Sequence, residues 1–306
     1  MKHLLFTVLI ACGSPASSPV KAPSPVPAQA GPVDESAAMA AYEAKQWPKC
    51  AALYEAIAGQ TKGEQRAGAI YNAACCHAQG GTFDAAFALL DRGVKHGMKS
   101  LEHVKADTDL APLHTDKRWP GILAGIERNV TAWESTLGDP ALRREILTMM
   151  VEDQKVRMAL IKSNAKPDQA AMDALKEIDT KTTTRMKAII AKHGWPGTKL
   201  VGPDGSHAAW LLVQHADLDL EFQKQCLALI EKAVAAGQAT ARNHAYLYDR
   251  VAAAENRPQR FGTQFIDGEP RPIEDEANVD ARRAAIGLPS MADYKKQMRA
   301  MYGDKM

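Results

Sequence analysis

The sequence has few aromatic residues and almost no net charge, and it lacks the signature motifs of common enzymes. Only 6% of its 306 residues are Phe, Trp or Tyr, and 38 basic against 36 acidic residues leave a formal net charge of +2. A nucleic-acid-binding protein usually has a basic surface, and one that binds single strands adds aromatic stacking platforms. The composition therefore argues against a nucleic-acid partner.

The motifs of several enzyme classes are missing. The chain has no Gly-x-Ser-x-Gly, no P-loop and no Gly-x-Gly-x-x-Gly, so serine-hydrolase, nucleotide-binding and Rossmann assignments lack support. Neither His-Glu-x-x-His nor Cys-x-x-Cys occurs, and His207 and His215 would lie about 12 Å apart along one helix, too far for one ion. We predict neither a metal nor a cofactor, and the sequence leaves open whether the protein is an enzyme.

The remaining composition is that of an ordinary globular protein. Hydrophobic residues make up 46% of the chain and charged residues 24%, which excludes a collagen-like, wholly disordered or multi-span membrane protein. A chain of this length is too long for one small core, so we expect about two domains.

The first twelve residues have the features of a secretory signal. A basic start is followed by an apolar run over residues 4–11, which is too short to span a bilayer but suits a signal h-region, and then by Cys12. Leu-Ile-Ala-Cys at 9–12 resembles the bacterial lipobox, which implies that Cys12 is acylated and becomes the new N-terminus. Gly13 follows in place of Asp, which favours the outer membrane by analogy with the lipoprotein sorting rule. We expect a lipid-anchored protein of the bacterial cell envelope; the alternative is a chance apolar N-terminus on a cytosolic chain.

A tether follows the signal segment. Residues 13–33 contain six prolines, four serines, four alanines and one charged residue, Lys21. Such a segment cannot bury enough apolar surface to fold, so we expect residues 13–35 to be an extended linker between the membrane anchor and the first domain.

Three segments of the N-terminal half are related at a spacing of 36 residues. Residues 47–57, which begin with Trp47, align with residues 83–93, which begin with Phe83, and the same offset leads to Trp119. In the first two copies a small residue, Cys50 or Ala86, stands three positions after the aromatic residue. This pattern predicts helical hairpins in which two helices approach closely.

The second copy resembles the tetratricopeptide repeat. Tyr-Asn-Ala-Ala-Cys-Cys-His-Ala-Gln-Gly-Gly-Thr-Phe at 71–83 is similar to its signature. The positions that carry the repeat pattern are Trp47, Tyr71, Gly81, Phe83, Ala86 and Val94. The resemblance covers about residues 36–126, and residues 107–119 resemble the tail that often caps such arrays. It implies a short array, over residues 36–133, with a concave groove for a protein or peptide partner; the alternative is a structural cap for the next domain. Because each hairpin exposes an apolar face, about three repeats form the smallest stable unit.

The second half reads as a mainly helical domain over residues 138–306. Apolar periodicity, Asp139 as the N-cap of the first helix, and Gly194 and Gly237 as stops predict helices at 140–163, 168–193, 220–236, 241–254, 279–286 and 291–302. Residues 193–205 read as a glycine- and proline-punctuated loop, and 259–265 as extended chain. We expect a further helix over residues 206–217. Its residues 208–213 have no polar side chain, so this helix should be buried on all sides. The expected fold class is all-α: a short helical-hairpin, tetratricopeptide-like array followed by a mainly helical C-terminal domain.

Five short motifs link this domain to a family. They are His-Gly-Trp-Pro at 193–196, Ala-Ala-Trp-Leu-Leu-Val-Gln-His-Ala-Asp at 208–217, Tyr-Asp-Arg at 248–250, Gly-Thr-Gln at 262–264 and Asp-Ala-Arg-Arg at 280–283. Together they resemble an uncharacterised bacterial helical domain family over about residues 140–295. The resemblance implies a module and says nothing of its chemistry.

Polar residues cluster at the ends of the buried helix and in the segments after it. The candidates for a pocket are His193, His215, Asp217, His244, Arg250 and Gln264. On a functional interpretation, His215 or His193 is a general base and Arg250 binds an anion. On the alternative interpretation these side chains satisfy helix ends and loop carbonyls, as buried polar groups must.

The remaining cysteines look structural. Adjacent Cys75 and Cys76 on a helix point apart and should not pair with each other, whereas a disulfide between Cys50 and one of them is an open alternative in an oxidising envelope.

Two functions follow from the sequence. The first is an anchored scaffold lipoprotein that binds a partner through its repeats; the second is an envelope hydrolase of unassigned type that uses the polar pocket.

Overall fold

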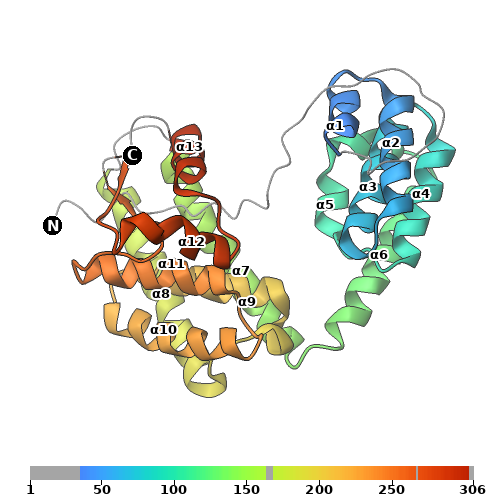
Figure 1. The fold of residues 1–306 in the computed structure, drawn as a ribbon. Coiled ribbons are helices and arrows are strands. Elements are labelled where there is room, and N and C mark those ends of the chain that lie inside the picture. Colours follow the sequence, from blue (N-terminus) through green and yellow to red (C-terminus); the bar gives the residue numbers. More distant parts are fainter. Residues whose placement is uncertain (1–34, 163–167, 267, 303–306) are drawn as a thin grey trace. The chain divides into compact units, whose positions relative to one another are not determined.

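The computed structural model describes residues 35–162, 168–266 and 268–302, which form two compact units (Figure 1). The boundary between the units falls between Thr136 and Leu137. Both units are mostly helical, which confirms the predicted all-α class with a helical array followed by a helical domain. Within the described ranges, no helix is long and apolar enough to cross a membrane. The predicted signal segment with Cys12 and all but the last residue of the tether lie outside these ranges.

The N-terminal unit is an array of packed helical hairpins. Its elements are α1 (Glu35–Glu43), α2 (Trp47–Gln60), α3 (Gly63–Gln79), α4 (Phe83–Lys95), α5 (Leu101–Ala106), η1 (Thr108–Leu113) and α6 (Trp119–Glu134). Helices α1 to α4 each pack against the next, and α6 packs against α4 and α5 (Figure 1). The helical-hairpin array expected from the sequence is therefore present.

The 36-residue spacing corresponds to the starts of α2, α4 and α6 at Trp47, Phe83 and Trp119. Proline follows both tryptophans in the first helical turn, where the missing N–H costs no hydrogen bond. The turn before α4 contains Gly81 at φ +75°, a conformation that favours glycine. A Cβ atom at Gly80 would lie 2.8 Å from Cβ of Trp47, so the aromatic residue of one hairpin packs on the turn of the next.

A disulfide joins the first two long helices of the array. Cys50 of α2 and Cys76 of α3 are bonded, with their Cα atoms 5.8 Å apart. The contact between these helices is rich in buried alanines, which lets their backbones approach closely. Cys75, which directly precedes Cys76 in α3, is buried and has a free thiol. Cys226 in the second unit is likewise buried with a free thiol. The pairing that the sequence left open is therefore Cys50 with Cys76.

The C-terminal unit contains the long helices that the sequence predicts. Its elements are α7 (Pro140–Lys162), α8 (Gln169–His193), α9 (Thr198–Gln214), α10 (Leu220–Ala235), α11 (Ala241–Ala254), β1 (Phe265–Ile266), β2 (Glu269–Pro270), η2 (Glu276–Asn278), α12 (Val279–Ala285) and α13 (Met291–Tyr302). Side chains of Asp168, Asp219 and Thr240 accept hydrogen bonds from backbone N–H groups in the first turns of α8, α10 and α11. These N-caps explain why the helix starts can be predicted locally.

The structure corrects the prediction of a loop over residues 193–205. Helix α9 already begins at Thr198 and is interrupted at Gly202, whose φ of +75° and ψ of 167° are open only to glycine. Pro203 then starts the second segment, where a first-turn proline is tolerated because its N–H would be unpaired in any case. Glycine and proline therefore mark a kink within α9, and the irregular chain before it is short.

The core of the C-terminal unit forms around the second segment of α9. Every residue from Ala208 to Val213 is buried, as expected from the lack of polar side chains in this stretch, and Trp210 is its largest member; the polar Gln214 is buried as well. Helices α7, α8, α10 and α11 all pack against α9. The residues just after this helix are thereby held in the interior of the unit, where they meet charged side chains of the surrounding helices.

Candidate functional site

Six ionisable side chains meet inside the C-terminal unit, and we call them the buried ionic network. They come from α7, α8, the connection between α9 and α10, and α11. The members are Asp153, Arg157, Asp179, His215, Asp217 and Arg250. Sequence reasoning had identified three of them: His215, Asp217 and Arg250.

Asp153 is the centre of the inner part of this network. Its side chain is fully buried and accepts a hydrogen bond from Arg157 Nε at 2.9 Å, one helical turn further along α7. Its second oxygen lies 2.8 Å from Nδ1 of His215. Arg157 also pairs with Asp179 of α8. The inner part therefore ties α7, α8 and the end of α9 together.

Asp217 and Arg250 form the outer part. Arg250 Nε donates to one oxygen of Asp217 at 2.7 Å and a terminal guanidinium nitrogen donates to the other, so the pair is bidentate. Gln223 of α10 donates to Asp217 at 3.2 Å and to the carbonyl oxygens of Val213 and Gln214. The Asp217 side chain is 26% exposed and that of Arg250 only 7%, so Asp217 is the part of the network most accessible to water.

The charges of the network are unequal, and the protonation states compensate for this. Three carboxylates face two guanidinium groups. Burial lowers the pKa of His215, and the two arginines add to this effect against Asp153, so the imidazole is neutral. Burial also raises the pKa of Asp179 to about 7; Arg157 opposes this shift, while Asp153 and Asp217 reinforce it. Asp179 is accordingly the group that holds a proton near neutral pH.

The pair of Asp153 and His215 resembles a general base oriented by a carboxylate. The imidazole, however, is only 2% exposed. In the part of the chain that the structure describes, no hydroxyl or thiol group bonds to its ring. The carboxylates and guanidinium groups are engaged with one another. This arrangement fixes the helices in one register more readily than it presents a reactive group to a substrate.

Three predicted pocket residues lie elsewhere. His193 ends α8 and is half-buried. His244 lies on α11 beside the ring of Tyr248, and burial lowers its pKa. Gln264 belongs to the segment after α11, where its backbone N–H donates to Gln259 at 2.8 Å. The six candidates therefore do not converge: three join the buried ionic network and three have local roles.

Asp249 organises a second polar centre. Its carboxylate accepts hydrogen bonds from the backbone N–H groups of Arg260, Phe261 and Thr263 at 2.7–3.2 Å and from the Thr263 hydroxyl at 3.0 Å. The side chain of Gln259 bridges the carbonyl oxygens of Gln264 and Arg271. Asp249 thus holds the segment at 259–264 against α11, while the next residue, Arg250, enters the network.

Sequence reasoning missed Asp153, Arg157, Asp179 and the role of Asp249. A signal was present for the first pair, because residues of opposite charge stand four positions apart within the apolar stripe of α7. Asp179 directly follows Ile178, an apolar residue of α8. Neither signal says which residue of another helix is the partner.

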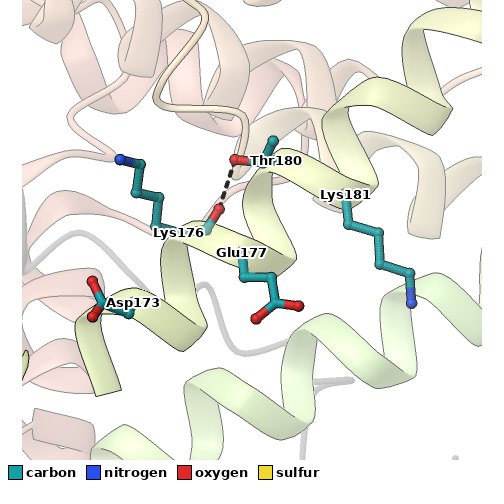
Figure 2. A pocket seen from close by; sticks show the side chains of 5 residues that line it. All are labelled: Asp173, Lys176, Glu177, Thr180 and Lys181. Carbon is teal, nitrogen blue, oxygen red and sulfur yellow. Dashed lines mark hydrogen bonds between the residues drawn. The ribbon is translucent and has the colours of Figure 1, made fainter. Parts of the chain in front are cut away.

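A surface hollow lies along the exposed side of α8 (Figure 2). It is lined by Asp173, Lys176, Glu177, Thr180 and Lys181, all exposed residues of one helix. Figure 2 shows the Thr180 hydroxyl donating to the carbonyl oxygen of Lys176, at 2.7 Å. Lys181 also pairs with Glu152 at 2.7 Å. Charges of both signs from a single helix do not define a ligand class. Among the described residues no group of side chains is arranged to hold a metal ion.

The N-terminal array holds a short segment of its own chain. We call residues 107–113, which include η1, the docked segment, and the side of α1 and α3 that contacts it the helix-A face. Tyr42 donates to both oxygens of Asp109 at 2.8 and 2.7 Å, and Tyr71 donates to Asp107 at 2.5 Å. Gln79 donates to the Asp109 carbonyl oxygen at 2.9 Å. The face therefore binds both aspartates of the segment by side-chain hydrogen bonds.

Among the predicted repeat residues, Tyr71 donates a hydrogen bond to the docked segment, and Ala86 belongs to the same apolar core as its two leucines. Trp47 packs edge-on against Tyr42, with ring centroids 5.5 Å apart. Ala86 is completely buried in α4, whereas Phe83 remains partly exposed at its start. The repeat signature thus defines hairpin packing and also supports the helix-A face.

These features describe an all-helical protein that combines a hairpin array with a domain held together by a buried ionic network. Residues 140–306, more than half of the chain, match the family of unknown function DUF6624, and the chain belongs to this family. This confirms that the C-terminal motifs belong to one uncharacterised helical module. No curated protein and no solved structure matches the chain.

Proposed function

We propose that this protein is a cell-envelope lipoprotein, anchored through Cys12, whose helical array binds a protein or peptide partner. The observation that carries the proposal is the helix-A face, which already holds a seven-residue segment by directed hydrogen bonds to two aspartates. Leu110 and Leu113 of this segment are buried in the core that α3, α4, α5 and α6 form. A surface that accommodates one short segment has the shape and chemistry needed for a peptide. The resemblance to tetratricopeptide repeats implies the same use.

Two further features support the envelope location. The disulfide between Cys50 and Cys76 is of a kind that persists in oxidising compartments and is rare in the cytosol. The sequence at 9–12 resembles a lipobox and is followed by the proline-rich segment, which would let the array extend from the membrane. Signal, tether and disulfide agree on one location outside the cytosol.

The anchor is tested by growing cells that produce the protein with an alkyne fatty acid and measuring label on the purified chain. We expect label on the wild type and none on a Cys12→Ala variant, whereas Cys226→Ala should be labelled normally because that thiol is buried. Equal labelling of wild type and Cys12→Ala would refute acylation at this position.

Partner binding is tested by photo-crosslinking in the same cells. A photoreactive amino acid in place of His103, which is exposed beside the docked segment, should give a discrete adduct with one envelope protein. The same amino acid in place of Glu177, exposed on α8, should not give this adduct. If neither position yields an adduct, or both yield the same one, the array is not the binding surface.

A hydrolase is the second candidate, and the observation in its favour is the pairing of His215 with Asp153 at 2.8 Å. Under this alternative, the purified chain should hydrolyse a member of a panel of chromogenic esters and phosphoesters. The activity should disappear in His215→Asn and persist in His193→Asn. Activity that survives His215→Asn in a folded protein would exclude this pair as the catalytic base.

A further inference from the structure

We propose that the docked segment is an internal substitute for the partner, so that the helix-A face recognises peptides of the type Asp-x-Asp-Leu-x-x-Leu and a partner must displace residues 107–113 to bind. The inference rests on the proposed function and adds the chemistry of the partner. It also predicts that the free array is in a self-occupied, weakly binding state.

The two aspartates of the segment are recognised separately. Asp109 is held by Tyr42 through both carboxylate oxygens, and Gln79 holds its backbone carbonyl oxygen. Asp107 accepts from the Tyr71 hydroxyl and, at 3.8 Å, from the Cys75 thiol. Each contact fixes the distance between helix and carboxylate, so the longer side chain of glutamate should fit poorly at either position.

The leucines provide the apolar part of the recognition. Leu110 and Leu113 are completely buried in the core of the array, whereas Thr108, Ala111 and Pro112 are exposed. In a 3₁₀ helix, residues three positions apart lie on the same side, which places both leucines toward the array. The segment therefore has one recognised side and one free side, as expected of a bound peptide.

The electrostatics of the face favour exchange. Hydroxyl and thiol groups hold the two carboxylates, the Gln79 amide holds the Asp109 carbonyl oxygen, and the side chain of His103, which is 66% exposed, lies 3.8 Å from Asp107. A hydrogen bond to a carboxylate is charge-assisted, but the hydroxyl and thiol donors here carry no charge, so among the described residues exchange of the segment breaks no ion pair with a lysine or arginine. The two carboxylates also lie close to each other, and burial together with Asp107 raises the pKa of Asp109. The segment is thus held by directed hydrogen bonds from uncharged groups.

The covalent link keeps the segment in place in the absence of a partner. A tethered segment has an effective concentration in the millimolar range, so a free peptide of equal affinity competes poorly. Removing the two carboxylates of the internal segment should release this competition while leaving the helix-A face intact.

The test uses the full chain and a fluorescent peptide with the sequence of residues 105–116. Wild type should bind the peptide weakly, and the Asp107→Ala, Asp109→Ala double variant should bind it at least tenfold more tightly. Adding Tyr42→Phe and Tyr71→Phe to that variant should abolish the gain, whereas Tyr248→Phe in the other unit should not. A peptide with asparagine at both aspartate positions should bind at least tenfold more weakly to the double variant.

Folding and alternatives are checked in the same samples. Circular dichroism identifies variants that have lost helix, and Asp107→Asn alone serves as the milder variant if the double variant unfolds. Absence of tighter peptide binding by a folded variant would overturn the proposal, even if the His103 crosslink to an envelope protein forms, because the partner would then use another surface. A dimer of the chain that excludes the peptide would overturn it in favour of segment exchange between copies. Tight peptide binding without any envelope crosslink would support the inference and count against the proposed function.

Discussion

Nδ1 of His215 lies 2.8 Å from a carboxylate oxygen of Asp153, and both side chains are almost completely buried. This bond connects the end of α9 to α7, and Arg157 extends the connection to Asp179 on α8. A buried ionic network costs desolvation energy to form and is sensitive to the loss of any one partner. Its contribution to stability can therefore be measured by single substitutions.

The substitution Asp153→Asn should destabilise the C-terminal unit strongly. It removes the carboxylate shared by Arg157 and His215, and breaking a buried pair on one side costs about 3 kcal/mol or more. Hydrogen exchange of peptides from α7 and α9 at increasing urea measures this loss separately from the array. The matched control is Glu145→Gln, which breaks an exposed pair between α7 and Arg185 of α8 and should cost less than about 1 kcal/mol. Equal losses would mean that the network contributes no more than a surface pair.

Asp179→Asn should change the pH dependence of stability. Because Asp179 has a pKa of about 7 in the folded chain against an ordinary 3.8, the folded state binds this proton more tightly, and the wild type loses stability as pH rises between these values. The variant cannot titrate there. Its stability relative to wild type should rise by about 2 kcal/mol from pH 5 to pH 7 and stay level above pH 8.

Urea unfolding at pH 5, 6, 7 and 8 tests this expectation. Glu177→Gln, an exposed position of the same helix, should leave the pH profile unchanged. A constant difference between Asp179→Asn and wild type across this range would show that Asp179 is ionised throughout.

Gly262→Ala should destabilise the segment that Asp249 holds. Gly262 has φ +70°, and a Cβ atom there would lie 2.6 Å from the sulfur of Met291 and 3.0 Å from Cδ1 of Ile273. Backbone strain together with crowding should cost about 2 kcal/mol. Gly237→Ala has a similar φ of +66° with no atom within 4 Å, so it should lose only the backbone part, about 1 kcal/mol. Thermal unfolding of both variants compares the two effects; a larger loss at Gly237 would contradict the crowding.

The disulfide should stabilise the array alone. It closes a loop with a sequence separation of 26, for which chain entropy predicts about 3.5 kcal/mol. Cys50→Ala with Cys76→Ala should reduce the hydrogen-exchange protection of α2 and α3 and leave α9 unaffected. A reducing agent should have this effect on wild type and none on the double variant. Unchanged protection after complete reduction, verified by alkylation of both thiols, would show that packing alone holds these helices.

Most of the fold could be predicted because its signals are local. Asp168 and Thr240 cap the helices that follow them, and the aromatic residue at each 36-residue step marks the start of a helix. The sequence predicts a loop where the structure has the kink at Gly202, because glycine and proline signal a break but do not say whether the helix resumes.

The candidate site could be predicted only in part because its bonds join distant segments. His215 and Arg250 stand out in the sequence, but their partners Asp153 and Asp217 lie 62 and 33 positions away. His193 and His244 have the same chemistry as His215, and only the packing of α8 and α11 determines that they stay outside the network. The docked segment shows the same limit, since a tail sequence does not reveal which helices it covers.

Asp249 and Arg250 are consecutive residues of α11 that bond in different directions, one to the segment at 259–264 and the other to Asp217. A rotation or shift of α11 would therefore disturb this segment and the pair of Arg250 with Asp217 at the same time. Substitutions that displace residues 259–264 should accordingly also weaken that ion pair, although no ionisable side chain of the segment takes part in it.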